Sequence, residues 1–528
     1  MRTWLKNGTV IDGSGQAAFP ADLLLDGDRI EAVLPRPGRI EPQGADRIYD
    51  IAGRVVTPGF IDGHRHGDLA ALLDNRYGEI ELAQGITTVV NGNCGLTPFP
   101  SMAATRSDWH RFLEPCLGPA PAAAAWPDFA AYRNELAQRP LRINVATQVG
   151  TGAIRTAVKG FSPAPYTAEE LRQAQNMLAA ALDQGALGAS MGIMYVPECY
   201  TRTDEFVELL RPLSGSDMLL SCHMRGEGNS LVSSVEEILS ICRQANVRLN
   251  ISHFKAVGIR NWDRLIHQAI DVIERSDLDV GVDFYPYLGG STTLMTLLPP
   301  TLQQGLTETL ALLASPGGPE LVRRELARSH PGWDSMVEAV GWDRIIVNAA
   351  GGPECQPLLG LSLAEIARRQ ACDPVDLLCR LLVEEKGNVG TIAMSMSQSD
   401  VDAIARLPYA SVISDSLYGR TDKPHPRLYG AFPRVLRDLV FERQVLTLEE
   451  AVAKMTGRSA ERHNLALRGQ IRPGWIADLN VFDPGQVRDQ ASYEDPRRLA
   501  TGMDLVLVNG QIAWQDGQPA RPGAGRIL

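Results

Sequence analysis

The sequence predicts an α/β fold: a (β/α)8 TIM-like barrel with a small β-sandwich built from both termini and an insertion after the seventh barrel strand. The middle of the chain alternates short apolar runs, such as "GITTVVNGN" and "VRLNISH", with helical patterns such as "TAEELRQAQNMLAAALDQG". Both ends of the chain are instead rich in short strands and tight turns. A doubly wound parallel sheet would show the same alternation in the middle and is the alternative.

Residues 1–56 and 466–528 share a hairpin pattern. Asn-Gly and Asp-Gly pairs separate apolar runs in "TWLKNGTVIDG", "ADLLLDGDRIEAVL" and "MDLVLVNGQIAWQDGQ". Such pairs favour the tight turns that connect two antiparallel strands. We therefore predict that the two segments assemble into one β-sandwich domain. Two independent capping hairpins are the alternative.

Residues 57–465 carry the predicted barrel. Eight apolar runs are candidates for its buried parallel strands: "VVTPGFID", "GITTVVNGN", "LRINVATQVG", "ALGASMGI", "DMLLSCH", "VRLNISH", "LDVGVDFYPY" and "ASVISD". Residues 286–342 interrupt the alternation after the seventh run with two helical patterns. Because loops at this end of barrel strands surround the active site, the segment is a candidate lid. An appendage that only packs against the barrel is the alternative.

The overall composition limits which partners the protein is expected to bind and in which cellular compartment it is expected to lie. The net charge of −11 over 528 residues argues against nucleic acid or an anionic membrane surface as a partner. No apolar run approaches the ~20 residues of a membrane span, and "MRTWLKNGTVIDGSG" lacks the apolar stretch of a signal peptide. The eight cysteines are scattered without a CxxC pair, which favours a reducing cytoplasm.

Six potential metal ligands follow predicted strands. They are His64 and His66 after the first strand, Cys94 after the second, His223 after the fifth, His253 after the sixth and Asp415 after the eighth. Each alone is more often a structural rim residue, but the carboxyl ends of barrel strands meet at one face, so we expect the set to converge. Imidazoles, a thiolate and a carboxylate suit zinc. Asp415 is placed to accept a proton from a metal-activated water, with a loop cap or an ordinary ligand as the alternative.

These motifs resemble those of the amidohydrolase superfamily. "VVTPGFIDGHRHGDLA" is similar to its first strand, and "GQIRPGWIADLNVFD" to the segment that closes its β-sandwich. Within the superfamily, "QGITTVVNGNCG", "CHMRGEG", "ISHFK", "DFYPYLGGSTTL" and "PHPRLYGAFPRVL" resemble the N-acyl-D-amino-acid deacylases, or D-aminoacylases. The chain departs from many two-metal members because "LGASMGIMYVP" has no lysine after strand four, a gap that Cys94 fills in the deacylase group.

The resemblance implies the roles of individual residues. One tightly bound Zn2+ would be held by Cys94, His223 and His253, while His64, His66 and Asp415 would form a second, weaker metal position. The substrate-binding residues of the group map onto Lys255, Tyr285, Ser291 and Arg427. A guanidinium fork such as that of Arg427 suits a substrate α-carboxylate. The loop "SDSLYGRTDKPHPR" differs from that of a typical D-aminoacylase, and its change could reshape the site for another side chain.

The function that this resemblance implies is zinc-dependent hydrolysis of N-acyl-D-amino acids. The products would be a carboxylate and a free D-amino acid, and the preference for the D-enantiomer rests on the resemblance alone. One alternative is a cyclic-amide hydrolase of the dihydropyrimidinase or dihydroorotase kind, which typically uses the lysine that is missing here. Another is a non-catalytic scaffold, which is expected to have lost its metal ligands.

Overall fold

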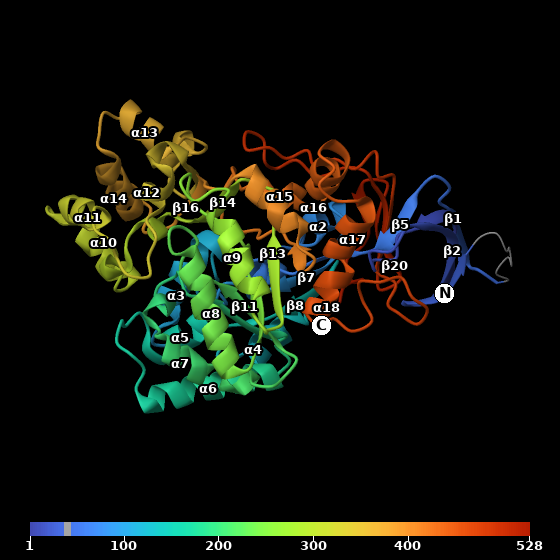
Figure 1. Ribbon diagram of the computed structural model, residues 1–528, viewed down its shortest axis with the longest axis horizontal. Helices are drawn as coiled ribbons and strands as arrows, with labels where there is room; N and C mark the ends of the chain where they lie inside the picture. The colour runs from blue at the N-terminus through green and yellow to red at the C-terminus, as the bar shows by residue number, and fades with distance from the viewer. Residues whose placement is uncertain (36–43) are drawn as a thin grey trace.

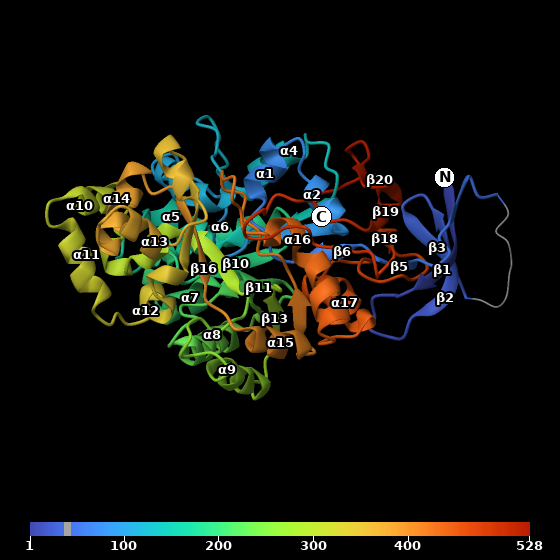
Figure 2. The same ribbon diagram turned by 90° about the horizontal axis from the view of Figure 1, so that it is seen from above.

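The computed structural model describes residues 1–35 and 44–528 and has a mixed α/β fold. Figures 1 and 2 place the N-terminal strands at one end of an elongated molecule and helices α10 to α14 at the other. Parallel strands and most of the remaining helices lie between the two ends. Among the helices of the described residues, none combines the length and apolar character needed to cross a bilayer.

Both chain termini contribute to one nine-stranded sheet. Its strands are β1 (Arg2–Val10), β2 (Phe19–Asp26), β3 (Arg29–Pro35), β4 (Arg47–Asp50), β5 (Val55–Pro58), β18 (Leu479–Phe482), β19 (Met503–Val508), β20 (Gln511–Gln515) and β21 (Gln518–Pro519). Asn509 and Gly510 both have positive φ, as the predicted Asn-Gly hairpin turn between β19 and β20 requires. Strand β5 pairs antiparallel with β18, so the two termini are joined and are not independent hairpins.

The middle of the chain supplies parallel strands in two sheets. One contains β6 (Phe60–Asp62), β7 (Ile86–Asn91) and β8 (Asn144–Thr147); the other runs in the order β17 (Ala410–Val412), β13 (Val280–Phe284), β12 (Arg248–Ile251), β11 (Leu219–His223), β10 (Gly188–Gly192) and β9 (Val149–Gly150). Neither sheet reverses its strand order, as a doubly wound sheet does. Only Gln148 separates β8 from β9, and a parallel bridge joins Arg65, after β6, to Ser416, after β17.

Amphipathic helices connect the parallel strands and cover them. They are α1 (Asp68–Leu73), α2 (Glu79–Ala83), α3 (Arg106–Leu117), α4 (Phe129–Leu136), α5 (Thr151–Lys159), α6 (Ala168–Asp183), α7 (Thr203–Leu209), α8 (Leu231–Ala245), α9 (Leu265–Glu274), α15 (Gln398–Arg406), α16 (Arg427–Arg434), α17 (Leu448–Met455) and α18 (Gly457–Arg462). Helix α6 begins at a capping box formed by Thr167 and Glu170, which satisfies two backbone donors at its start. Its buried residues lie on one face and include Ala174 and Leu178, as the helical pattern predicts.

A separate unit lies between β13 and β17 in the chain. It contains β14 (Gly289–Thr293), α10 (Leu306–Ala314), α11 (Gly318–Leu326), α12 (Met336–Val340), β15 (Ile345–Ala350), α13 (Leu363–Arg369), α14 (Pro374–Glu384) and β16 (Val389–Met394). The three strands form an antiparallel sheet in the order β14-β16-β15. A second hydrophobic core runs from Leu294 to Val389, so residues 286–342 pack together with the segment that follows them.

Candidate active site

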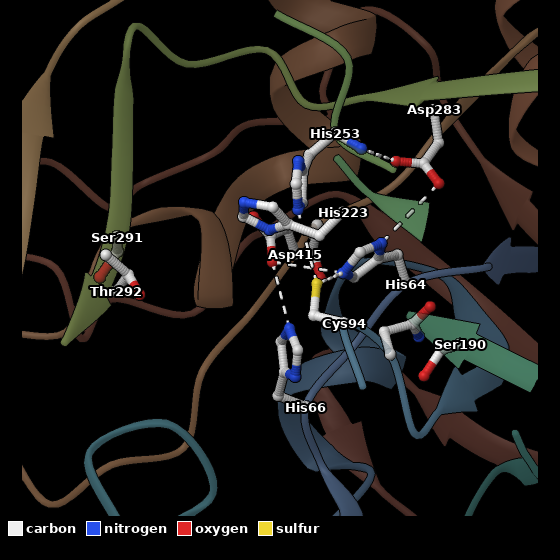
Figure 3. A network of polar contacts seen from close by, with 12 residues as sticks. His64, His66, Cys94, Ser190, His223, His253, Asp283, Ser291, Thr292 and Asp415 are labelled. Carbon is white, nitrogen blue, oxygen red and sulfur yellow. Dashed lines mark hydrogen bonds and ion pairs between the residues drawn. The ribbon is translucent and has the colours of Figure 1, made fainter. Parts of the chain in front are cut away.

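The six predicted metal-ligating residues lie side by side at the carboxyl ends of the parallel strands. Figure 3 shows their side chains pointing toward one another. Three overlapping groups each place their ligand atoms within 4.8 Å of one another: His64, His66 and Cys94; Cys94, His223 and His253; and His64, His253 and Asp415. All six residues are buried. We call these six residues the ligand wall.

Cys94 is held at the centre of this group by the turn that follows β7. Its backbone has a φ of 55°, and its Sγ lies 3.4 Å from His64 Nε2 and 3.5 Å from His253 Nε2. Ser190, on β10, accepts a hydrogen bond from Gly95 N at 3.0 Å and donates one to Gly92 O at 2.5 Å, so it ties both sides of the turn together. Burial raises the pKa of the Cys94 thiol well above its usual value, and a metal cation is what stabilises such a thiol as thiolate.

His223 and His253 come from the neighbouring strands β11 and β12. Burial lowers the pKa of both imidazoles well below the usual value, and a neutral imidazole is the form that coordinates a metal. His253 Nδ1 lies 3.1 Å from Glu227 Oε1, which can accept its proton and leave Nε2 for a metal. The backbone N–H of His253 donates to Asp283, near the carboxyl end of β13.

His64, His66 and Asp415 complete the ligand wall. Asp415 Oδ1 lies 3.5 Å from His64 Nε2 and 3.4 Å from His66 Nε2, while Asp415 Oδ2 lies 2.9 Å from Arg427 Nη1. Burial alone would raise the pKa of Asp415, but Arg427 and the histidines outweigh it and hold that pKa well below the usual value. Asp415 is therefore an ionised carboxylate. The Asp415 backbone N–H donates to His64 O at 3.0 Å, which ties the first and last parallel strands together at the site.

Arg65, between the two histidines of the HxH motif, is fully buried behind the site. Its guanidinium donates to Asp62 at 3.0 Å and to Glu81 at 2.8 Å. Asp62 in turn accepts from Ser414 N at 3.0 Å. This buried network connects the segment that carries His64 to the segment that carries Asp415 and orients both.

The predicted substrate-binding residues lie beside the ligand wall. Lys255, Tyr285 and Ser291 line one cavity together with ligand-wall residues. Arg427 contacts this lining: its guanidinium stacks 4.8 Å from the Tyr285 ring and Nη2 donates to Ser291 O at 3.3 Å. Lys255 Nζ donates to Glu227 Oε1 at 2.6 Å. The structure thus brings all ten predicted site residues into one region.

Part of the cavity lining comes from the unit between β13 and β17. Gly290, Ser291 and Thr292 on β14, Met336 on α12, Ala393 on β16 and Ser395 just after it all line the cavity. We call these six residues the insertion wall. Figure 3 shows Ser291 and Thr292 on their strand, apart from the metal-ligating side chains. Thr292 Oγ1 lies 3.1 Å from the Tyr195 hydroxyl, which links the insertion wall to the loop after β10.

Sequence reasoning missed three residues that support the site. Glu227, Asp283 and Ser190 contact ligand-wall residues or the turn that carries one of them. Asp283 lies near the carboxyl end of a parallel strand in "GVDFYPY", close to the position that identified the histidines, and this signal could have found it. Glu227 follows His223 by four residues in "HMRGEG", but nothing in that loop sequence indicates its contact with His253.

The donor set fits a zinc ion. Buried imidazoles, one buried thiol and one carboxylate surround a common region, and these are the ligand types that zinc prefers. Among the described residues, the Nδ1 atoms of His66 and His223 are buried without a hydrogen-bond partner, while His64 Nδ1 lies 3.8 Å from Asp283 Oδ2. A buried nitrogen without a hydrogen-bond partner destabilises the folded protein, so such nitrogens indicate a site that binds a ligand.

Comparison with known proteins agrees with this geometry. The model of the "Amidohydrolase family" matches residues 47–205 and 351–513. The chain belongs to the amidohydrolase family. A D-aminoacylase from Alcaligenes xylosoxydans xylosoxydans is 34% identical over 99% of this chain and 96% of its own length. The resemblance to the deacylase group is thereby confirmed.

Solved structures of D-aminoacylase and of a related deacylase are also similar to this chain. One is a D-aminoacylase structure with a TM-score of 0.83 at 33% identity, and the match covers 100% of this chain and 99% of that chain. That enzyme has a binuclear metal centre, described as showing one-metal activation and second-metal attenuation. The N-acyl-D-glutamate deacylase from Bordetella bronchiseptica, complexed with zinc and a phosphonate mimic of the tetrahedral intermediate, has a TM-score of 0.81 at 32% identity with the same coverage. A dihydropyrimidinase from Brevibacillus agri NCHU1002, at 14% identity and a TM-score of 0.57 over 100% of this chain and 98% of its own, shares the fold.

Proposed function

We propose that this protein hydrolyses the amide bond of N-acyl-D-amino acids, giving a carboxylate and a free D-amino acid. The observation that carries the proposal is the grouping of Cys94, His223 and His253 beside an ionised Asp415, in a chain similar to D-aminoacylase over nearly its full length. The partner is a small-molecule substrate, and we place the protein in the cytoplasm.

The fold that we propose for this activity is a closed (β/α)8 barrel. The order β6-β7-β8 and β9 to β17, the short gap between β8 and β9, and the bridge between Arg65 and Ser416 all support closure. We assign residues 1–56 and 466–528 to a β-sandwich domain and residues 57–465 to the barrel. The candidate lid begins with residues 286–342, and the extent of the second core supports its continuation to Met394.

The metal that we propose is zinc. Cys94, His223 and His253 would hold one ion tightly, and His64, His66 and Asp415 would form a second, weaker position. Zinc supplies Lewis acidity, which activates water and polarises a carbonyl group. The neutral state of the two buried imidazoles His223 and His253 supports their assignment to the tight position.

Asp415 is the proposed proton carrier. Because Oδ2 is paired with Arg427 at 2.9 Å, Oδ1 is the atom left to take a proton from the attacking water. The same atom then delivers the proton to the leaving nitrogen, so that the amine departs neutral. Since Arg427 and the histidines hold the pKa of Asp415 low, the carboxylate is ionised, and a proton that Oδ1 takes up is held weakly and passes readily to the more basic leaving nitrogen.

Lys255, Tyr285, Ser291 and Arg427 are the proposed substrate-binding residues. Lys255 and Arg427 supply positive charge next to the cavity, which suits the α-carboxylate of an N-acylated amino acid. The Tyr285 hydroxyl is buried without a hydrogen-bond partner among the described residues, so it is available to donate to a bound carboxylate or to the developing oxyanion.

The direct test is hydrolysis by the purified zinc-loaded protein. N-acetyl-D-amino acids, their L-enantiomers, a hydantoin and dihydrouracil are assayed side by side by release of amine or by ring opening. We expect hydrolysis of the D-series with little turnover of the others. Ring opening without D-deacylation would favour the cyclic-amide alternative, and an inactive protein that binds no zinc would favour the scaffold.

A further inference from the structure

The part of the cavity beyond the metal ligands is lined mainly by apolar side chains. They are Leu96, Cys116, Met194, Tyr195, Val257, Met336, Ala393 and Leu417. Leu96 and Cys116 are fully buried, while Met336 is partly exposed and comes from the insertion wall. A cavity of this composition stabilises an apolar group by removing it from water.

The positive charges around the cavity already have partners. Among the described lining residues, Lys255 and three histidines are the side chains that can carry positive charge, and the histidines face the metal position. Lys255 Nζ donates to Glu227 Oε1 at 2.6 Å and to His253 O at 2.8 Å, and it lies 2.7 Å from His253 Nδ1. Arg427 is fully buried against Asp415 and Ser291.

These cations suffice for one substrate carboxylate. Every N-acyl amino acid carries an α-carboxylate, and in the proposed function it shares Lys255 and Arg427 with their existing partners Glu227 and Asp415. A second carboxylate, on the side chain of glutamate or aspartate, meets no further cation among the described lining residues and faces the carboxylates of Glu227 and Asp415. Burying an unpaired charge beside like charges is strongly unfavourable.

We propose that the cavity selects N-acyl-D-amino acids with an uncharged apolar side chain, such as methionine, leucine or phenylalanine, and rejects those with an acidic side chain. This inference rests on the proposed deacylase function and names its substrate class. It sets the chain apart from the N-acyl-D-glutamate deacylase to which it is also similar.

Met336 is the specificity-determining residue that the structure offers for a test. It opens helix α12, and the preceding Asp334 fixes the start of that helix against the loop that carries Glu227. Asp334 Oδ2 accepts from Gly228 N at 2.9 Å and from Ser230 Oγ at 2.7 Å. Since Met336 is partly exposed and does not belong to the ligand wall, its side chain can be changed without burying a charge or disturbing the metal.

The experiment compares kcat/KM for N-acetyl-D-methionine and N-acetyl-D-glutamate at constant zinc occupancy. For the wild-type protein we expect the methionine derivative to exceed the glutamate derivative by at least about 100-fold, because the second carboxylate is buried without a partner. Met336→Lys adds a cation to the insertion wall and should narrow that ratio by about 10-fold or more, mainly through KM for the acidic substrate. Met336→Leu is the matched apolar control and should keep the ratio within about threefold of wild type.

The outcomes separate the two proposals. Equal or faster hydrolysis of the glutamate derivative by the wild-type protein overturns the apolar selection while leaving deacylation intact, and this measurement needs no variant. A folded Met336→Lys protein with an unchanged ratio overturns the role of Met336. Absence of hydrolysis for every N-acetyl-D-amino acid overturns the proposed function, and this inference with it.

Discussion

The ligand wall and the insertion wall enclose one cavity but are built differently. Three ligand-wall residues, Cys94, His253 and Asp415, have positive φ values of 55°, 35° and 51°. Among the insertion-wall residues, all of which are described, none has a positive φ. Backbone conformations of this kind are costly for non-glycine residues and persist where the surrounding structure fixes them.

The difference assigns the two walls different tasks. The ligand wall is fixed by strand ends, by the buried Arg65 network and by contacts to Glu227 and Asp283, so its side chains have little freedom. The insertion wall belongs to a unit with its own hydrophobic core, and it contacts the ligand wall through Arg427, which donates to Ser291 O and pairs with Asp415. We infer that the ligand wall sets the chemistry and that the insertion wall tunes which substrate reaches it.

The largest effect is expected from removing the thiol of the ligand wall. Cys94→Ala deletes the sulfur that lies near both His64 and His253, so the tight zinc position loses a ligand. We expect a protein with less than about one tenth of the wild-type zinc content and a kcat/KM at least ~1,000-fold lower. Metal analysis after gel filtration and steady-state kinetics measure both.

Cys116→Ala is the matched control for that variant. Cys116 also lines the cavity as a buried free cysteine, but it belongs to none of the candidate metal-binding groups. We expect it to keep full zinc occupancy. Equal zinc loss in both variants would show that the effect of Cys94→Ala comes from general damage to the cavity.

A slightly smaller effect is expected from Asp415→Asn. The amide cannot take a proton from water, so kcat should fall by about 100- to 10,000-fold, as for other general bases. Zinc at the Cys94, His223 and His253 position should stay bound, since Asp415 is outside that group. Loss of that zinc together with activity would make Asp415 chiefly a metal ligand and would contradict its assignment as the proton carrier.

The sequence allowed the ligand wall to be predicted but not the insertion wall. The ligand wall could be predicted because each of its residues lies at or shortly after the end of an apolar strand, and the carboxyl ends of parallel strands meet in space. The insertion wall could not, since β14 meets β16 through pairs such as Ser291 with Ile392, which are a hundred residues apart. Glu227 escaped prediction for a related reason: its contact with His253 depends on how the loop after β11 folds back over β12.

Glu227→Gln probes how firmly the ligand wall is oriented. The carboxylate lies 3.1 Å from His253 Nδ1 and also pairs with Lys255, so the variant should weaken the hold on that imidazole. We expect zinc affinity to fall by about 10- to 100-fold, measured by competition with a chromogenic chelator. Glu237→Gln is the control, since Glu237 pairs with Arg225 and contacts no ligand-wall residue among the described contacts. Unchanged zinc affinity in Glu227→Gln would remove Glu227 from the support of the metal position.

The smallest effect, and the one that most sharply separates the walls, is expected from Asp334→Asn. This change weakens the hydrogen bonds that hold the start of α12 against Gly228 and Ser230, so the insertion wall should become less well placed. We expect KM for N-acetyl-D-methionine to rise by about three- to tenfold, with kcat within about twofold of wild type, because the bonds are loosened rather than removed. Zinc content should not change, since Asp334 contacts no metal-ligating side chain among the described contacts. A fall in kcat or in zinc content without a rise in KM would mean that the insertion unit supports the ligand wall directly, and the division of tasks between the two walls would be wrong.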